Sequence, residues 1–289
     1  MAVTSQQALQ NADLAQALEA LKAEVRREPA AVKHRVYMFQ LACVLGDWER
    51  ALTQLNVARD MSAECLSLAQ TYQELIQCEA VRREVFAGKR SPLFFGEPEE
   101  WIALVLEATK LSGQGNHAQA AELRAKALEQ VEPSPGRAFL RKAEEAAPHT
   151  AAASDEVDPG VPFEWIADAD SRLGPILEAV INAKYYWVPF SRLRRVDFEK
   201  PTDLRDVVWL PAHFEWTNGG EVVGFVPTRY PATEQASDDL LRLARKTDWQ
   251  QVAPDVYHGL GQRLLTTDAE EYSLLELRQL QFDERAATA

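Results

Sequence analysis

Two aspartates and an arginine stand close together in the stretch WIADADSRLGP, residues 165–175. Carboxylates at Asp168 and Asp170 could bind a metal or move protons, and the guanidinium of Arg172 could pair with either acid. Residues two apart on a helix point in divergent directions, so this spacing does not predict a shared metal cage. Acidic side chains ahead of the apolar run PILEAVI fit the start of a helix better. We therefore expect a helix over residues 168–183 and interpret the stretch as structural.

The alternative is a ligand-binding or hydrolase-like site in the second half of the chain. It would require five side chains to converge in one pocket, namely Asp168, Asp170, Arg205, His213 and His258. Neither histidine has a second His or Cys at ligand spacing, and no Ser or Cys lies in a nucleophile-elbow context. The sequence therefore predicts no catalytic residue, no metal and no cofactor, and this alternative depends on convergence in the fold.

The composition excludes several classes of partner. The net charge of −13 argues against broad contact with nucleic acid, whose binders cluster Lys and Arg. No apolar run approaches the roughly 18 residues that span a bilayer, and the start of the chain shows no secretory signal. Three cysteines without metal-type spacing suggest buried thiols in a reducing compartment. We expect a cytoplasmic protein that binds neither nucleic acid nor membrane.

The first half of the chain has the pattern of helices, which form part of the framework that positions these residues. The phrases NADLAQAL, GDWERAL and GNHAQAA start with a turn and place alanines at Ala17, Ala51 and Ala120. The first two alanines are 34 residues apart and the last two are 69 apart, about two such periods. Turn residues let two helices fold back, and alanine lets them approach closely. This pattern resembles tetratricopeptide hairpins, interrupted by a longer helix that runs to Gly88.

The second half of the chain has a different pattern. Short runs rich in β-branched and aromatic residues predict strands, at residues 185–190, 207–212, 221–227 and 274–282. The sequence TNGG at 217–220 predicts a hairpin turn between two of them, and residues 236–246 predict a second helix.

These patterns divide the chain into three segments. We predict a tetratricopeptide-like α-α superhelix at 1–131, followed by a smaller α+β domain at 161–289. Residues 132–160 are rich in Pro, Ala, Ser and acids, which predicts a linker with a possible short helix over 138–146.

The concave face of such helical hairpins is a surface on which a partner helix could lie. Counting back from the turn at Gly46 places Val36, Gln40, Cys43 and Val44 on that face. We therefore predict these four as partner-binding residues.

Several phrases in fixed order resemble the ImpE family, also called TagJ or SciE. They include FEWIADADSRLGPILEAVINAKYYWVPFSRL, PTDLRDVVWLPAHF, VPTRYP, LARKTDW and GLGQR, and in the first half FQLACVLGDWERALTQL and CEAVRREVFAG. The resemblance covers nearly the whole chain outside the linker.

The resemblance implies an accessory component of a bacterial type VI secretion system, without enzymatic activity and located in the cytoplasm. It implies binding to the N-terminal helical region of the small subunit of the contractile sheath. It also implies an effect on sheath assembly, or on disassembly by the AAA+ unfoldase of the system. The family provides no catalytic residues to assign to positions here.

Overall fold

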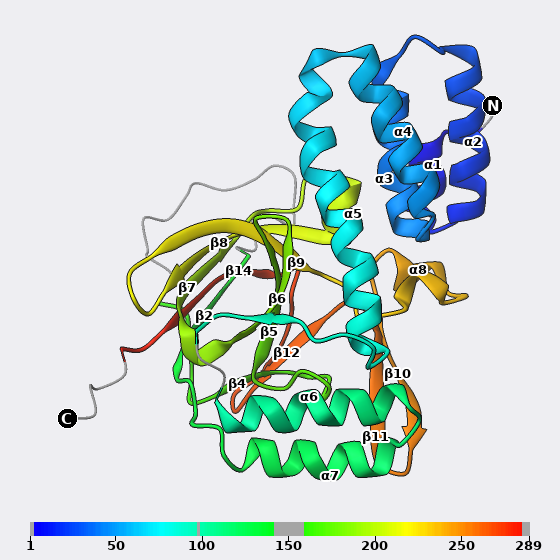
Figure 1. The fold of residues 1–289 in the computed structure, drawn as a ribbon. Coiled ribbons are helices and arrows are strands. Elements are labelled where there is room, and N and C mark those ends of the chain that lie inside the picture. Colours follow the sequence, from blue (N-terminus) through cyan, green and yellow to red (C-terminus); the bar gives the residue numbers. More distant parts are fainter. Residues whose placement is uncertain (1–2, 97–98, 142–158, 285–289) are drawn as a thin grey trace.

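The computed structural model describes residues 3–96, 99–141 and 159–284. Its first part is a group of helices, shown in blue and cyan in Figure 1. They are α1 (Ser5–Gln10), α2 (Leu14–Arg27), α3 (Val32–Leu45), α4 (Trp48–Met61), the short 3-10 helix η1 (Ala63–Cys65) and α5 (Leu66–Phe86). Helix α5 has 21 residues and ends beside Gly88, which confirms the predicted long helix.

The predicted turn phrases begin the second helix of each hairpin. Helices α1 and α2, α3 and α4, and α6 (Glu100–Gly113) and α7 (His117–Leu128) pack as antiparallel pairs. Ala17, Ala51 and Ala120 are fully buried in these pairs, because only a small side chain allows two helices this close. The pair α6–α7 does not extend the stack of α1–α4: α7 packs on the strands β10 (Thr247–Ala253) and β11 (Val256–Gly261), below the sheet in Figure 1.

A nine-stranded sheet forms the centre of the molecule, in the order β1-β6-β5-β9-β8-β7-β14-β2-β3. Its strands are β1 (Leu93–Phe94), β2 (Gly136–Leu140), β3 (Val161–Phe163), β5 (Ile176–Ile181), β6 (Lys184–Pro189), β7 (Leu193–Phe198), β8 (Trp209–Trp216), β9 (Glu221–Pro227) and β14 (Leu277–Phe282). A smaller sheet contains β4 (Ile166–Asp168), β12 (Leu264–Thr267) and β13 (Glu271–Ser273). The described part of the chain also contains the short helical segments η3 (Phe190–Arg192), η4 (Leu204–Val207), η5 (Thr233–Gln235) and α8 (Asp239–Arg242).

The helices and the sheet share one hydrophobic core. The face of the sheet toward α5 carries Trp187 and Trp209, which are fully buried. Between ring centroids, Trp187 lies 5.7 Å from Phe86 and Trp209 lies 6.1 Å from Tyr72, and both partners belong to α5. Strand β1, which follows α5 in the chain, also pairs in parallel with β6. Because the core and a strand both cross between the halves, the helices and the sheet hold each other in place.

Three local predictions were wrong. Residues 168–183 contain a strand, β5, in which all six residues are buried, so the apolar run is a two-sided buried strand and not a capped helix. The helix predicted over 236–246 is only α8, four residues long. The short helix predicted over 138–146 begins instead as part of strand β2, and its residues beyond Arg141 lie outside the described part.

The four predicted strands were confirmed. Strands β6, β8, β9 and β14 overlap the four predicted runs, although β8 starts at Trp209 and continues to Trp216. Residues 217–220 connect β8 to β9, which pair as an antiparallel hairpin.

Gly113 at the end of α6 gives a test of this packing. A Cβ atom there would lie 2.2 Å from the carbonyl oxygen of Ala87, which follows α5. Backbone cannot give way as a side chain can, so Gly113→Ala should lower the free energy of unfolding by about 3 kcal/mol. Chemical denaturation measures this.

Gly115→Ala is the control. It has no atom within 4 Å of its Cβ position but has φ +83°, so it should cost only about 1–2 kcal/mol of backbone strain. Equal costs for the two variants would contradict the close α5–α6 contact.

Candidate functional site

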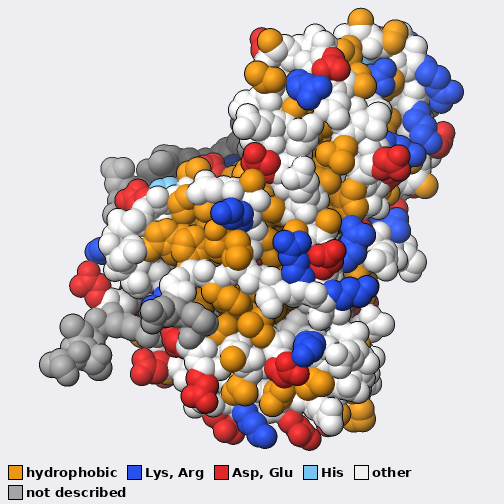
Figure 2. All heavy atoms as spheres, viewed as in Figure 1, with side chains coloured by type: hydrophobic (Ala, Val, Ile, Leu, Met, Phe, Trp, Pro, Cys, Tyr) orange, Lys and Arg blue, Asp and Glu red, His pale blue; other side chains and the backbone are white. Residues whose placement is uncertain are grey.

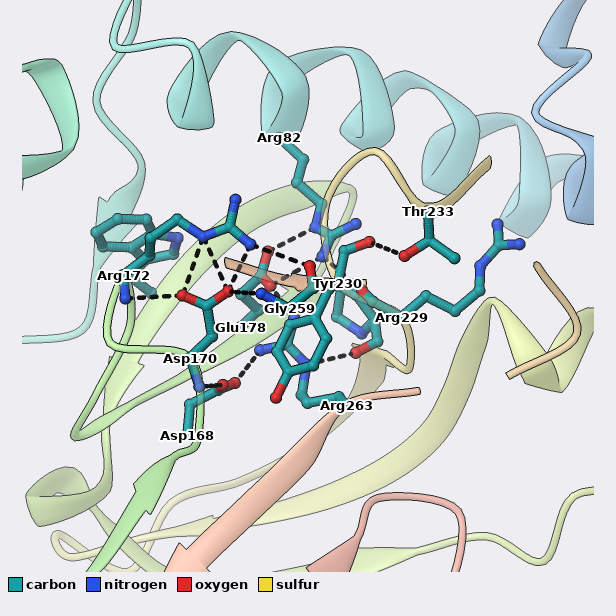
Figure 3. Close-up of polar contacts among 12 residues, drawn as sticks. Arg82, Asp168, Asp170, Arg172, Glu178, Arg229, Tyr230, Thr233, Gly259 and Arg263 are labelled. Atoms are coloured by element: carbon teal, nitrogen blue, oxygen red, sulfur yellow. Dashed lines mark hydrogen bonds and ion pairs between the residues drawn. The ribbon is translucent and has the colours of Figure 1, made fainter. Parts of the chain in front are cut away.

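The aspartates of WIADADSRLGP hold a loop in place. Asp168 ends β4, and its Oδ1 accepts a hydrogen bond of 2.8 Å from the backbone N–H of Asp170. Asp170 accepts from Nε of Arg172 at 2.9 Å and from the backbone N–H of Gly259 at 2.8 Å (Figure 3). Both carboxylates are buried, and every contact comes from a donor of the chain itself. The structural interpretation of these residues agrees with this geometry.

Glu178 on β5 is the centre of this buried network and is fully shielded from solvent. It accepts two hydrogen bonds from Arg82 on α5, from Nε at 2.6 Å and from Nη2 at 3.0 Å. The hydroxyl of Tyr185 and the guanidinium of Arg263 also donate to it. Glu178 therefore joins a helix of the first half to the strands of the second half (Figure 3).

Two further buried arginines extend the network. Arg263 pairs with both Asp168 and Glu178 and donates to the carbonyl of Pro227 at 3.0 Å. Arg229 donates from Nη1 to the carbonyl of Val44, at the end of α3, at 2.9 Å. These guanidiniums act as cross-links between elements that are distant in the sequence.

The electrostatics of the three acids differ. Burial alone would raise the pKa of Glu178, but Arg82 and Arg263 outweigh burial and lower it to about 2. Burial likewise opposes ionisation of Asp170, but Arg172 keeps its pKa below the ordinary value. For Asp168, burial outweighs Arg263 and raises the pKa to about 7.

The network has no feature of a metal site. In the described part of the chain, no group of three or more His, Cys, Asp or Glu side chains is placed to hold a metal ion. The oxygens of Asp170 and Glu178 already accept from N–H and O–H groups of the chain, which stabilise an ionised carboxylate without leaving a ligand position open.

The five residues of the alternative site have different partners. His213 on β8 lies 3.2 Å from Glu221, and Arg205 on η4 lies 2.6 Å from Asp203 with its guanidinium over the ring of Tyr72. His258 on β11 lies against His117. The structure thus brings Asp168 and Asp170 into one network but gives Arg205 and His213 separate surroundings.

The four predicted partner-binding residues divide into two pairs. Cys43 and Val44 are fully buried, and their carbonyl oxygens accept from Arg229. Gln40 is mostly buried, and its amide bonds to Asp203 and to the backbone of Leu204. Sequence reasoning missed that this face of α3 packs against the chain's own second half.

Val36 and Gln40 do line an open groove of about 810 Å³ along α3. Its walls come from the helices of the first half and from residues 202–204 of the second half. The lining is mixed, with Val36 and Tyr37 beside Lys33, Glu64 and Asp203. Such a mixture of apolar surface and polar anchors is typical of helix-in-groove recognition.

The molecular surface carries both signs of charge. On the face shown in Figure 2, Lys and Arg are interspersed with Asp and Glu, and hydrophobic side chains gather over the sheet. None of the helices described is both long enough and apolar enough to span a bilayer.

Comparison with known proteins identifies the family. A sequence model described as "ImpE protein" matches residues 160–281. The chain is also 42% identical over 283 residues to the type VI secretion system accessory component TagJ of Pseudomonas aeruginosa, an alignment that covers 98% of this chain and 92% of that protein. The chain belongs to the ImpE/TagJ family. The predicted family resemblance is thereby confirmed, and an accessory role in type VI secretion follows from it.

This chain is also similar in fold to a solved structure. A crystal structure of a Vibrio parahaemolyticus protein superposes with a TM-score of 0.82 at 26% identity and covers 99% of each chain. The mixed α and α+β architecture therefore extends to a distant relative.

The most buried charged residues of the network were missed at the sequence level. Glu178, Arg82 and Arg263 are separated by up to 181 residues in the chain, and no local spacing relates them. One signal was present: Glu178 interrupts an otherwise apolar run, and a buried carboxylate requires a cation.

Glu178→Gln tests the network. It keeps the shape but removes the charge that Arg82 and Arg263 share, so the free energy of unfolding should fall by about 3–5 kcal/mol. The control Glu276→Gln removes an exposed pair with Arg141 and should cost less than about 1 kcal/mol. Denaturation of both variants measures the difference, and similar costs would show that the network adds no stability.

His258 gives a pH test. Burial, with a contribution from the charge of Arg172, lowers the pKa of His258 to about 4 from an ordinary value of 6.5. The unfolded chain therefore binds a proton that the folded chain does not, and stability present above pH 6.5 is lost as the pH falls toward 4.

At low salt, the wild type should lose more stability between pH 7 and pH 4.5 than His258→Gln does. Denaturant titrations at both pH values measure this. Parallel pH profiles would contradict a half-buried His258 that stays neutral in the folded chain.

Proposed function

We propose that this protein is a non-enzymatic adaptor that acts in the cytoplasm and binds the N-terminal helical region of the small contractile-sheath subunit. Through this contact it modulates assembly of the sheath, or its disassembly by the AAA+ unfoldase, with which any link is indirect. The accessory role of the family supports the proposal, and the groove along α3 is the observation that carries it.

The dimensions of the groove suit one face of a short helix. An α-helix with its side chains is about 10 Å across and rises 1.5 Å per residue, so the volume of the groove is comparable to that of roughly two turns. The groove contains apolar positions at Val36 and Tyr37 and charged positions at its rim. An amphipathic helix matches this combination, because its apolar stripe is buried while its flanks pair with the rim.

The groove is suited to recognising a partner by shape, which is what a non-enzymatic adaptor requires. The carboxylates of the buried network are held by arginines of the chain. In the groove, Glu24 accepts hydrogen bonds from the backbone N–H and the hydroxyl of Ser5, at 3.1 and 2.9 Å, and so caps the start of α1. Recognition here depends on shape and on the two halves being held together, because Leu204 of the second half forms part of the wall.

Titration calorimetry with a synthetic peptide of the sheath subunit's N-terminal helix tests the proposal. The wild-type chain should bind with micromolar or tighter affinity. Val36→Asp should weaken binding at least tenfold, because it buries a charge against the apolar stripe of the peptide.

Val223→Asp is the matched control. Val223 lies on β9, is 72% exposed and does not line the groove, so this variant should bind as the wild type does. No heat with the wild-type chain would contradict the partner, and equal binding by the Val36 and Val223 variants would contradict the groove.

A further inference from the structure

A second polar cluster lies where α7 meets β11, next to the buried network. Ser112 at the end of α6 accepts a hydrogen bond of 3.3 Å from Nη2 of Arg124, and its hydroxyl lies 3.2 Å from Nδ1 of His117. The ring of His117 contacts the ring of His258 edge-on, with 5.5 Å between centroids. Arg124 follows His117 by seven residues, two helical turns, so both side chains lie on the same face of α7.

This cluster contains buried hydrogen-bonding atoms without partners. Arg124 is only 3% exposed, and its Nε and Nη1 make no hydrogen bond within the described ranges of the chain. Nε2 of His258 is buried and unpartnered as well. Buried N–H groups are rarely left unsatisfied in folded proteins, since each costs the free energy of its lost hydration.

The cluster also lacks a counter-charge. Asp170, the acid whose charge acts on Arg124, is committed to Arg172 and to the backbone N–H of Gly259. The pair Asp170–Arg172 is neutral, and no salt bridge to Arg124 is formed by any described carboxylate. Burial lowers the pKa of Arg124 to about 10, still well above neutral pH, so its guanidinium remains charged inside the protein.

We propose that a small monovalent anion of the size of chloride binds between the guanidinium of Arg124 and the imidazole of His258. It accepts hydrogen bonds from Arg124 and from Nε2–H of the neutral His258 ring. A monovalent charge balances the single unpaired guanidinium, whereas a buried dianion would leave excess negative charge. A water molecule could accept the same hydrogen bonds, but it would leave the charge uncompensated.

The proposed anion joins two elements that pack against each other. Arg124 belongs to the α6–α7 hairpin, and His258 belongs to the β10–β11 ribbon on which α7 packs. Binding of the anion therefore stabilises the docking of this hairpin on the second half of the molecule, far from the groove along α3 (Figure 1).

Thermal unfolding of the full chain in sodium chloride, with sodium gluconate keeping the ionic strength constant, tests this site. Chloride should raise the melting temperature of the wild type saturably, by roughly 3 °C or more. Arg124→Met should lose the response, and without chloride it should be at least as stable as the wild type, because it removes an uncompensated charge. The control Arg141→Met, at an exposed ion pair, should respond as the wild type does.

Two further readouts do not depend on a variant. Chloride should raise the pKa of His258 toward its ordinary value, measured from its imidazole proton shifts. Crystals grown in sodium bromide should show an anomalous peak within hydrogen-bond distance of Arg124. No chloride effect at constant ionic strength, an equal effect on all three proteins, or a crystal with only water beside Arg124 would overturn the proposal.

Discussion

The rest of the structure depends on one buried carboxylate. Glu178 lies in the middle of a fully buried strand and is bound by Arg82 from α5 and by Arg263 from the far end of the chain. A carboxylate in this position is unstable without cations, and each of these guanidiniums is unstable without a carboxylate. The requirement is mutual, so neither half of the molecule satisfies its buried charges alone. This interaction helps to hold the helices against the sheet, whose face toward α5 belongs to the same hydrophobic cluster as the helices.

The fixed relation between the halves also determines which surface of the helices is available. In a free-standing stack of helical hairpins, the face of α3 that carries Cys43 and Val44 would be open to a partner. Here Arg229 and Gln40 attach that face to the second half. What remains open is the stretch around Val36, where Leu204 and its neighbours add a wall. If the proposed function holds, the second half covers the part of α3 that carries Cys43 and Val44, and it forms one wall of the groove around Val36.

Sequence patterns predicted the elements better than their relations. The alanine spacing identified the helical hairpins, since close helix contacts require small residues regardless of where the hairpin lies. Strand β5 was mistaken for a helix because a six-residue apolar run fits either structure, and the acids before it resembled a helix cap. The network could not be predicted, because Arg82 and Glu178 are brought together only by tertiary folding. Tertiary folding also decides that Val44 is buried while Val36 lines the groove. The helical register of α3 placed both on the same face and could not distinguish them.

The polar clusters around Glu178 and around Arg124 differ in whether their buried charges are paired within the chain. Around Glu178, acids and arginines alternate, and each donor has an acceptor, so the cluster is complete within the chain. Around Arg124, two buried donors have no acceptor among the described residues, and the acid Asp170 is already paired with Arg172. Both clusters join helices to strands, the first between α5 and β5 and the second between α7 and β11. A complete cluster makes that junction permanent, whereas an incomplete one makes the α6–α7 junction depend on an ion from solution. The stability of the hairpin is then linked to anion concentration, while the wall of the groove along α3 is not.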